Sequence, residues 1–258
     1  MNFPHKYRLF DVDISKINYK ELTEIVISAA KNRSKMIVDH MPVHGLITAS
    51  LDPEFRRATS GFDIIAPDGQ PVCWALNILY NAGISDRVYG PTFMKILCNR
   101  ISQEGIGIYL FGSDSQTLNA LNSKLLKKYP LLKITGLESP PFRPFTDAEE
   151  KQIIQRINDS GAEVVFVGLG CPKQEIFSYK HRESIQAVQI CVGAAFDFIA
   201  NTKKQAPAWM QKNGLEWLYR MASEPRRLWK RYLIYNSIFI IKFLKELFLK
   251  RSNLTKDR

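Results

Sequence analysis

A strand, a glycine-containing turn and a helix follow one another repeatedly along this chain, and this repetition restricts the fold more than any other feature. Short apolar runs end in turns, and segments with apolar residues at helical spacing follow them. The expected strands cover residues 35–38, 64–66, 106–111, 132–136, 163–167 and 188–192. Alternating strands and helices predict an α/β fold, with a mainly parallel sheet and flanking helices.

Asp68 is the first candidate for a chemical role. It lies in the turn Pro67-Asp68-Gly69, between an apolar run and a segment in which Pro71 suits the first turn of a helix. Ligands of α/β proteins bind at the carboxyl ends of strands, and a carboxylate there can accept a proton from a substrate hydroxyl. Taken alone, the pattern favours a helix cap, which is the commoner role of such an Asp.

Three glycine turns follow expected strands at the same relative place, at Gly112, at Gly168 to Gly170 and at Gly193. Their amides could face a diphosphate at helix N-termini. The sequence has neither a Walker motif nor a complete G-x-G-x-x-G, which argues against NTP hydrolysis and NAD chemistry. Arg87 could hold an anion or be a surface charge, and Gly90 would let the backbone approach a ligand.

No metal or cofactor is expected. His40 and His44 follow the first of these strands and could contact a substrate, but no third zinc ligand accompanies them. The D-x-D triplet at Asp11 and Asp13 precedes any strong strand. A turn in which Asp13 or Ser15 caps a helix over residues 19–32 is the preferred interpretation.

The four cysteines have no C-x-x-C spacing and are interpreted as reduced thiols of a cytosolic protein. The first residues lack an apolar stretch of signal-peptide length, so we expect no export.

Positive charge is concentrated at the C-terminal end. The formal net charge is +11, and fourteen basic but only four acidic residues lie from Lys203 onward. This asymmetry predicts an acidic partner.

Residues 233–249 are apolar at helical spacing, yet shorter than the roughly 20 residues that span a bilayer. We expect a helix in the interface of an anionic membrane, with packing on the body or a dimer helix as alternatives. The expected division is a body at 1–200 and a basic appendage at 201–258.

Five motifs together resemble the WecG/TagA/CpsF family of bacterial glycosyltransferases (glycosyltransferase family 26). The resemblance runs from about His40 to Tyr232, with the motifs in family order. The motifs are Ala66-Pro67-Asp68-Gly69, Arg87-Val88-Tyr89-Gly90, Gly168-Leu169-Gly170-Cys171-Pro172-Lys173-Gln174-Glu175, Val192-Gly193-Ala194-Ala195-Phe196-Asp197, and Gly214-Leu215-Glu216-Trp217 followed by Glu224-Pro225-Arg226-Arg227.

The resemblance implies a Rossmann-like domain and a C-terminal helical appendage that meets the cytoplasmic membrane from inside. It implies an inverting transferase that moves a sugar from a UDP-sugar to a polyprenyl-diphosphate-linked sugar, in cell-surface polysaccharide or exopolysaccharide biosynthesis. The catalytic base falls on Asp68, Gln174 lies near the donor, and Arg220, Arg227 and Lys230, with Arg231, reach a diphosphate. The other residues expected to bind substrate are His40, His44, Gln70, Arg87, Gly90, Gly112, Gly170, Pro172, Lys173, Glu175 and Asp197.

One departure affects the expected substrate. His40 and Pro42 stand where many members carry a T-x-N turn, whereas His44 fits a position where many have His. The donor sugar therefore stays open among a hexose, an N-acetylhexosamine and a hexuronic acid.

Two other classes remain as alternatives. A non-catalytic nucleotide- or nucleic-acid-binding protein would use the basic tail, but the apolar run at 233–249 suits lipid better. An epimerase would need a dinucleotide fingerprint. Nucleic acid is not the expected partner, and the oligomeric state, with a homo-oligomer possible, stays open.

Overall fold

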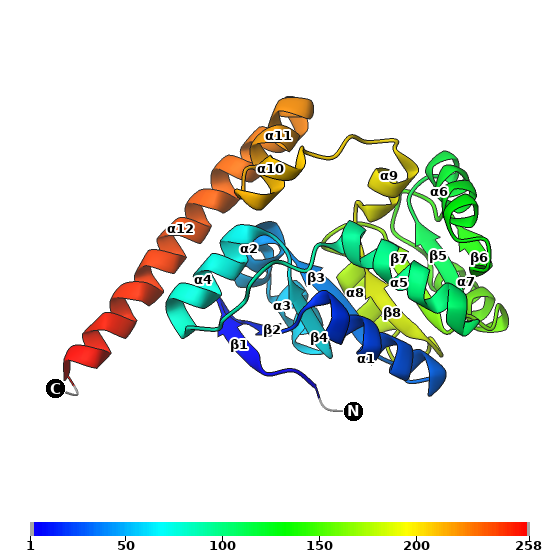
Figure 1. Ribbon diagram of the computed structural model, residues 1–258, viewed down its shortest axis with the longest axis horizontal. Helices are drawn as coiled ribbons and strands as arrows, with labels where there is room; N and C mark the ends of the chain where they lie inside the picture. The colour runs from blue at the N-terminus through cyan, green and yellow to red at the C-terminus, as the bar shows by residue number, and fades with distance from the viewer. Residues whose placement is uncertain (1–2, 257–258) are drawn as a thin grey trace.

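The structure is a computed structural model that describes residues 3–256, with side chains described as far as residue 250. Its centre is a parallel sheet with the strand order β4-β3-β8-β7-β5-β6 (Figure 1). The strands are β3 Ile37–Met41, β4 Ile64–Pro67, β5 Gly107–Gly112, β6 Lys133–Glu138, β7 Val164–Gly168 and β8 Val188–Cys191. The predicted α/β class with a mainly parallel sheet is confirmed.

Helices cover both faces of this sheet, because successive strand side chains point to opposite sides. One face packs against α1, α5, α6 and α9, and the other against α2, α3, α4, α7 and α8. The helices are α1 Tyr19–Lys31, α2 Val43–Leu51, α3 Pro53–Ser60, α4 Gln70–Tyr80, α5 Gly90–Glu104, α6 Ser115–Lys128, α7 Asp147–Asp159, α8 Lys173–Lys180 and α9 Ala195–Ala200.

The N-terminal segment differs from the prediction. Strands β1 (Lys6–Leu9) and β2 (Val12–Ser15) form an antiparallel hairpin. Neither Asp13 nor Ser15 caps α1, so that expectation was wrong. Asn18 is the N-cap and forms a capping box with Glu21. The hairpin forms because its apolar side chains alternate into the core beside α4.

Strand β3 is also displaced from its predicted position. It begins at Ile37 and continues to Met41, so Asp39 and His40 belong to the strand and not to its exit. Both residues pair with neighbouring strands, Asp39 with β4 and β8 and His40 with β4. Pairing with neighbouring strands extends β3 through these polar residues, and the local sequence does not reveal that pairing.

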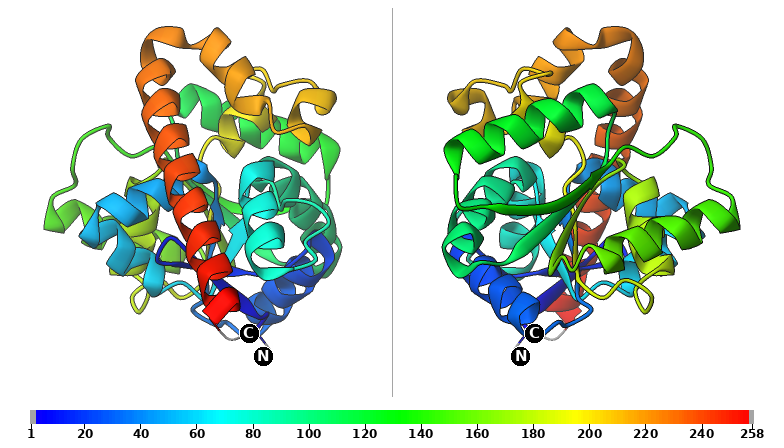
Figure 2. Two further views of the ribbon diagram at one scale, coloured as in Figure 1. Left: turned by 90° about the vertical axis from the view of Figure 1, so that its left-hand side faces the viewer. Right: turned by 90° about the vertical axis from the view of Figure 1, so that its right-hand side faces the viewer.

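The C-terminal part consists of α10 (Ala208–Lys212), α11 (Glu216–Ser223) and the long α12 (Pro225–Lys256). Figures 1 and 2 show α12 running beside α2 and α4. Phe239 of α12 is buried and its ring meets that of Phe10, 5.3 Å away between centroids. Near the other end, the Lys250 ammonium donates to the carbonyl of Leu79. One side of α12 therefore packs on the body.

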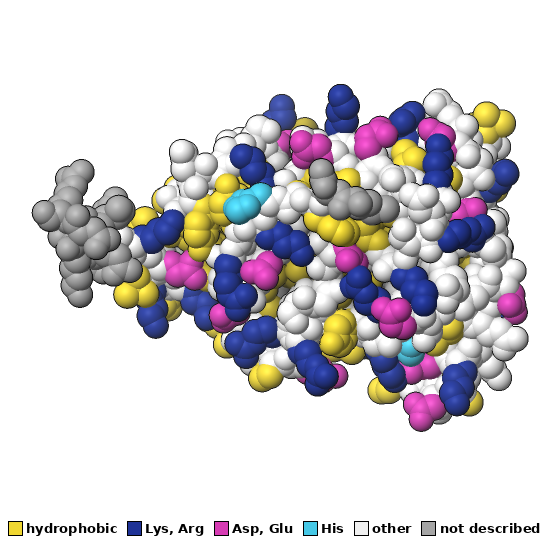
Figure 3. Space-filling view, turned by 90° about the horizontal axis from the view of Figure 1, so that it is seen from below, with side chains coloured by type: hydrophobic (Ala, Val, Ile, Leu, Met, Phe, Trp, Pro, Cys, Tyr) yellow, Lys and Arg dark blue, Asp and Glu magenta, His cyan; other side chains and the backbone are white. Residues whose placement is uncertain are grey.

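Other apolar side chains of α12 stay exposed, among them Ile234, Ile241, Leu244 and Phe248. Figure 3 shows hydrophobic and basic side chains mixed at the end of the molecule that carries the C-terminus. No helix in the described part of the chain is long and apolar enough to cross a membrane.

Candidate active site

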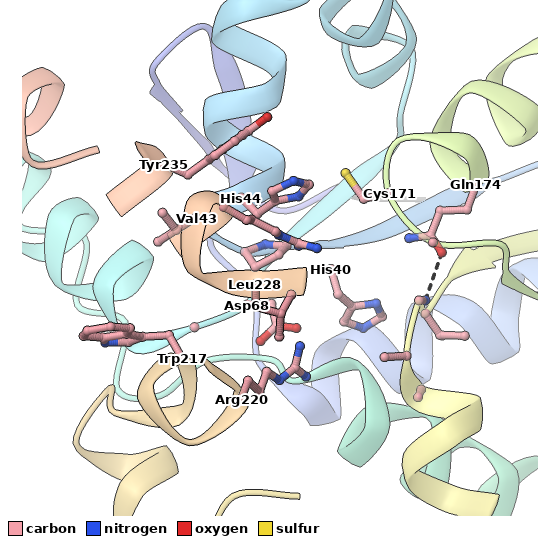
Figure 4. Close-up of a pocket in the computed structure, with 18 of the residues that line it drawn as sticks. His40, Val43, His44, Asp68, Cys171, Gln174, Trp217, Arg220, Leu228 and Tyr235 are labelled. Atoms are coloured by element: carbon pink, nitrogen blue, oxygen red, sulfur yellow. Dashed lines mark hydrogen bonds between the residues drawn. The ribbon is translucent and has the colours of Figure 1, made fainter. Parts of the chain in front are cut away.

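A cavity of about 1880 Å³ opens at the carboxyl edge of the sheet, where strands β3, β4, β7 and β8 end. The appendage helices α11 and α12 form its opposite wall. Figure 4 shows side chains from both parts converging there. Ligand sites typically occupy about 300–1,000 Å³, so this cavity has room for two substrates.

Asp68 lies in this cavity directly after β4. The backbone holds it there, since the Asp68 amide donates to the Met41 carbonyl at 3.1 Å. The alternative role as a helix cap is not seen, because Gly69 occupies the N-cap position of α4 and no side chain caps it. The backbone amide of Gly90 acts to lower the pKa of the Asp68 carboxyl group. The Asp68 side chain keeps 15% of its surface exposed, which leaves a small opening toward the cavity.

Burial raises the pKa of Asp68 from its ordinary value to about 7, although the Arg87 guanidinium opposes the shift. Glu216 adds to the rise and Arg220 reduces it. A carboxylate that titrates near neutral pH is suited to general base catalysis, because it is ionised often enough and still binds a proton well.

The appendage supplies part of this site through Glu216. Arg87 donates to Glu216 at 2.8 Å and to Gln211 at 2.9 Å, and lies 3.7 Å from Asp68. The Tyr89 hydroxyl donates to Glu216 at 3.2 Å, and Arg220 forms an ion pair with it at 3.0 Å. Charged groups beside the Asp68 carboxylate thus fix the appendage to the loop between α4 and α5, which carries Arg87 and Tyr89.

Sequence reasoning assigned no role to Tyr89, Gln211 or Glu216. Tyr89 and Glu216 stand within two of the motifs that carried the family resemblance, so the signal was present. Their partnership was not visible because 127 residues separate them in the chain.

A second part of the site is built on the turns after β7 and β8. Gln174 is 4% exposed, and its side chain accepts from the Gly193 amide and donates to Glu175, both at 2.9 Å. It therefore joins the two turns. Around Gly170, which has φ +80°, an added Cβ would meet nothing within 4 Å, so its backbone is open to a ligand.

Gly112 allows a close approach between the turns after β5 and β7. An added Cβ would lie 2.5 Å from the carbonyl carbon of Gly168, and φ is +126°. This glycine permits close packing of two turns behind the cavity.

Two buried carboxyl groups belong to this part of the molecule, Glu175 in the lining of the cavity and Asp39 on β3. Both side-chain oxygens of Asp39 and one of Glu175 have no hydrogen-bond partner among the described groups. Burial raises the pKa of Glu175 to about 7, and burial together with Glu175 raises the pKa of Asp39 well above its ordinary value. The pair therefore retains a proton at neutral pH.

His40 and His44 both line the cavity and are neutral. The Nδ1 atom of His40 lies 3.2 Å from the carbonyl oxygen of Cys191, so Nδ1 carries the proton and Nε2 is an acceptor. Burial lowers the pKa of His40 to about 4 and that of His44 to about 3. The His44 ring lies against Tyr235, 4.7 Å between centroids (Figure 4).

Within residues 3–250, no three His, Cys, Asp or Glu side chains are grouped as metal ligands. Asp11 and Asp13 instead form ion pairs with Arg8.

Most of the predicted residues meet at this one cavity. Those that line it are His40, His44, Asp68, Gln70, Arg87, Gly170, Lys173, Gln174, Glu175, Asp197, Arg220, Arg227 and Arg231. Gly90, Gly112, Pro172 and Lys230 lie outside the lining. Gly90 begins α5, Pro172 precedes α8, and the Lys230 ammonium lies over the ring of Trp229, 5.5 Å from its centroid.

A carboxyl group with a raised pKa at the carboxyl edge of a parallel sheet, with arginines in the same cavity, is an arrangement typical of an active site. Comparison with known proteins specifies the class. Residues 7–253 match the model of the glycosyl transferase WecG/TagA/CpsF family, and the chain belongs to this family. It is therefore a glycosyltransferase, as the motifs predicted.

One relative is the N-acetylglucosaminyldiphosphoundecaprenol N-acetyl-beta-D-mannosaminyltransferase of Bacillus subtilis (strain 168). It is 29% identical to this chain over 213 residues, which are 76% of this chain and 80% of the relative. Family membership favours the enzyme over the alternative of a non-catalytic binding protein.

Proposed function

We propose that this protein is an inverting glycosyltransferase that transfers a sugar from a UDP-sugar to a polyprenyl-diphosphate-linked sugar, in the synthesis of a cell-surface polysaccharide. The observation that carries the proposal is the position of Asp68, a carboxylate with a pKa of about 7 between the two halves of a cavity large enough for both substrates. The name of the Bacillus subtilis relative supports an acceptor of this kind.

The donor would lie at the turns after β7 and β8, where Gly170 offers open backbone and Lys173 a positive charge. The acceptor would lie on the side of α11 and α12. Ionised Asp68 takes the proton of the acceptor hydroxyl while its oxygen attacks C1 of the sugar from the face opposite UDP. The bond from C1 to the diphosphate oxygen breaks, and its electron pair leaves with UDP.

Positive charge near the departing diphosphate lowers the barrier to this step. Lys173 lines the donor side of the cavity and Arg220 lies near Asp68, whereas Arg87 contributes indirectly because its guanidinium is engaged with Glu216 and Gln211. No metal is needed in this scheme. The proposed location is the inner membrane surface, where a lipid-linked acceptor and the basic appendage would meet.

The test is release of UDP from a panel of UDP-hexoses, UDP-N-acetylhexosamines and UDP-hexuronic acids, with N-acetylglucosaminyl polyprenyl diphosphate as acceptor. Removing a general base costs about 10²–10⁴-fold in rate, and we expect this loss in Asp68→Asn. Asp13→Asn is the control, because Asp13 is half exposed and lies outside the cavity. Equal rates for Asp68→Asn and wild type would show that Asp68 is not the base. Failure to release UDP from any of the tested donors would refute the proposed transfer.

A further inference from the structure

The cavity continues beyond the arginines into a groove between α4 and α12. We define the prenyl groove as Trp74 and Ile78 of α4 with Ile240 and Phe243 of α12, all of which line the same cavity as Asp68. Resting on the function proposed above, we propose that this groove holds the hydrocarbon chain of the acceptor lipid beside its diphosphate.

The groove walls are apolar and exposed. Trp74, Ile78 and Ile240 keep 48%, 59% and 55% of their surface accessible. Trp74 and Ile78 are one turn apart and so lie on one side of α4. Large apolar side chains that face a shared hollow, and not one another, indicate an apolar ligand.

The two helices are held at both ends of the groove. Lys250 of α12 donates to the Leu79 carbonyl and its ammonium lies 4.1 Å from the centroid of the Tyr80 ring. At the other end, Trp74 packs against the turn before α11, where a Cβ on Gly214 would lie 2.9 Å from the indole. Figure 2 shows α4 and α12 side by side between these points. The groove is therefore a fixed feature of the docked appendage.

The order of chemical groups along α12 matches the order along a lipid diphosphate sugar. Arg227 and Arg231 line the cavity on successive turns near α11, and the apolar lining residues follow toward Phe243. From Arg231 to Phe243 the helix advances about 18 Å, at roughly 1.5 Å per residue. A ligand with its sugar at Asp68 and its diphosphate at these arginines would place its chain in the groove.

Exposed residues on another side of α12 distinguish a lipid-chain site from general membrane adhesion. Ile234 and Ile241 are 50% and 66% exposed and do not line the cavity. They provide a matched control on the same helix. Continuity of the groove with the site of Asp68 favours the acceptor's own chain over a second protein.

The experiment compares Ile78→Ser/Ile240→Ser with the control Ile234→Ser/Ile241→Ser, in detergent solution. Each is assayed with the same sugar diphosphate on a long polyprenyl chain and on a short, water-soluble prenyl chain. We expect the groove variant to lose about tenfold in kcat/KM, equivalent to roughly 1.4 kcal/mol, with the long chain only. The control should match wild type with both acceptors. Equal losses with both acceptors, no loss, or the same loss in the control would overturn the inference.

A binding measurement separates this inference from the proposed function. Long-chain polyprenyl diphosphate without a sugar is titrated into each protein while Trp74 fluorescence is followed, with Trp74→Phe identifying its signal. Weaker binding in the groove variant than in the control supports the groove even if no transfer occurs, in which case the proposed function alone fails. Equal binding by the two variants refutes the groove even if transfer occurs.

Discussion

Replacing Glu216 by Gln should move the acidic limb of the pH–rate profile to lower pH. In the proposed reaction the limb reports ionisation of Asp68, whose pKa is about 7 in the intact site. Glu216 repels the Asp68 charge and also engages Arg87, which it meets at 2.8 Å. The substitution removes the repulsion and leaves the Arg87 charge to act on Asp68. Both changes stabilise the ionised carboxylate.

The distances set the size of the shift. At the 3.7 Å between Arg87 and Asp68, opposite charges attract by about 4 kcal/mol at an effective dielectric constant of roughly 20. Acting alone, that energy would lower the pKa of Asp68 by about 3 pH units. Glu216 cancels part of it in the wild type, so we expect its removal to lower the limb by about 1 pH unit. The reciprocal variant Arg87→Gln should raise it.

The assay is kcat/KM for sugar transfer as a function of pH, with binding checked at each end of the range. Glu183→Gln serves as the control, because the Glu183 side chain is 80% exposed. An unchanged limb in Glu216→Gln, or a limb at higher pH, would contradict the assigned electrostatics. So would shifts in the same direction for Glu216→Gln and Arg87→Gln.

Two further predictions concern stability. The raised pKa values of Asp39 and Glu175 mean that the folded protein favours their neutral forms. Their contribution to the free energy of unfolding is therefore complete at low pH and declines as pH rises toward and past about 7. Glu175→Gln should flatten the pH dependence of the free energy of unfolding between about pH 5 and pH 8, and an unchanged slope in denaturant titrations would argue against a shared proton. Gly112→Ala should lower the free energy of unfolding by about 2 kcal/mol or more, because the new Cβ would clash with Gly168 and the backbone would be strained. Gly161→Ala, at φ +69° with nothing within 4 Å, should cost only about 1 kcal/mol, and equal losses would show that the close approach to Gly168 is unimportant.

Local patterns were sufficient to predict the sheet, because each strand carries its own apolar run and a turn at its end. They located Asp68 for the same reason, since its turn lies within a few residues of β4. The Asn18 cap has a local signature, since Glu21 follows three residues later. It was missed because the segment before it was interpreted as a turn, whereas the β1–β2 hairpin depends on contacts with α4 and the sheet. Charge partnerships such as Arg87 with Glu216 are set by how the appendage docks, and no local pattern encodes that.

The division of the catalytic surroundings between the body and the appendage gives the site a built-in dependence on assembly. If α11 were detached, Asp68 would gain solvent and face Arg87 without competition from Glu216. Both changes favour its ionised form, so the detached protein would hold a weaker base, and a chain ending before Asn201 should show a lower pKa for Asp68 by NMR titration. Base strength is then a property of the joined molecule, because the appendage buries Asp68 and places Glu216 and Arg220 near it.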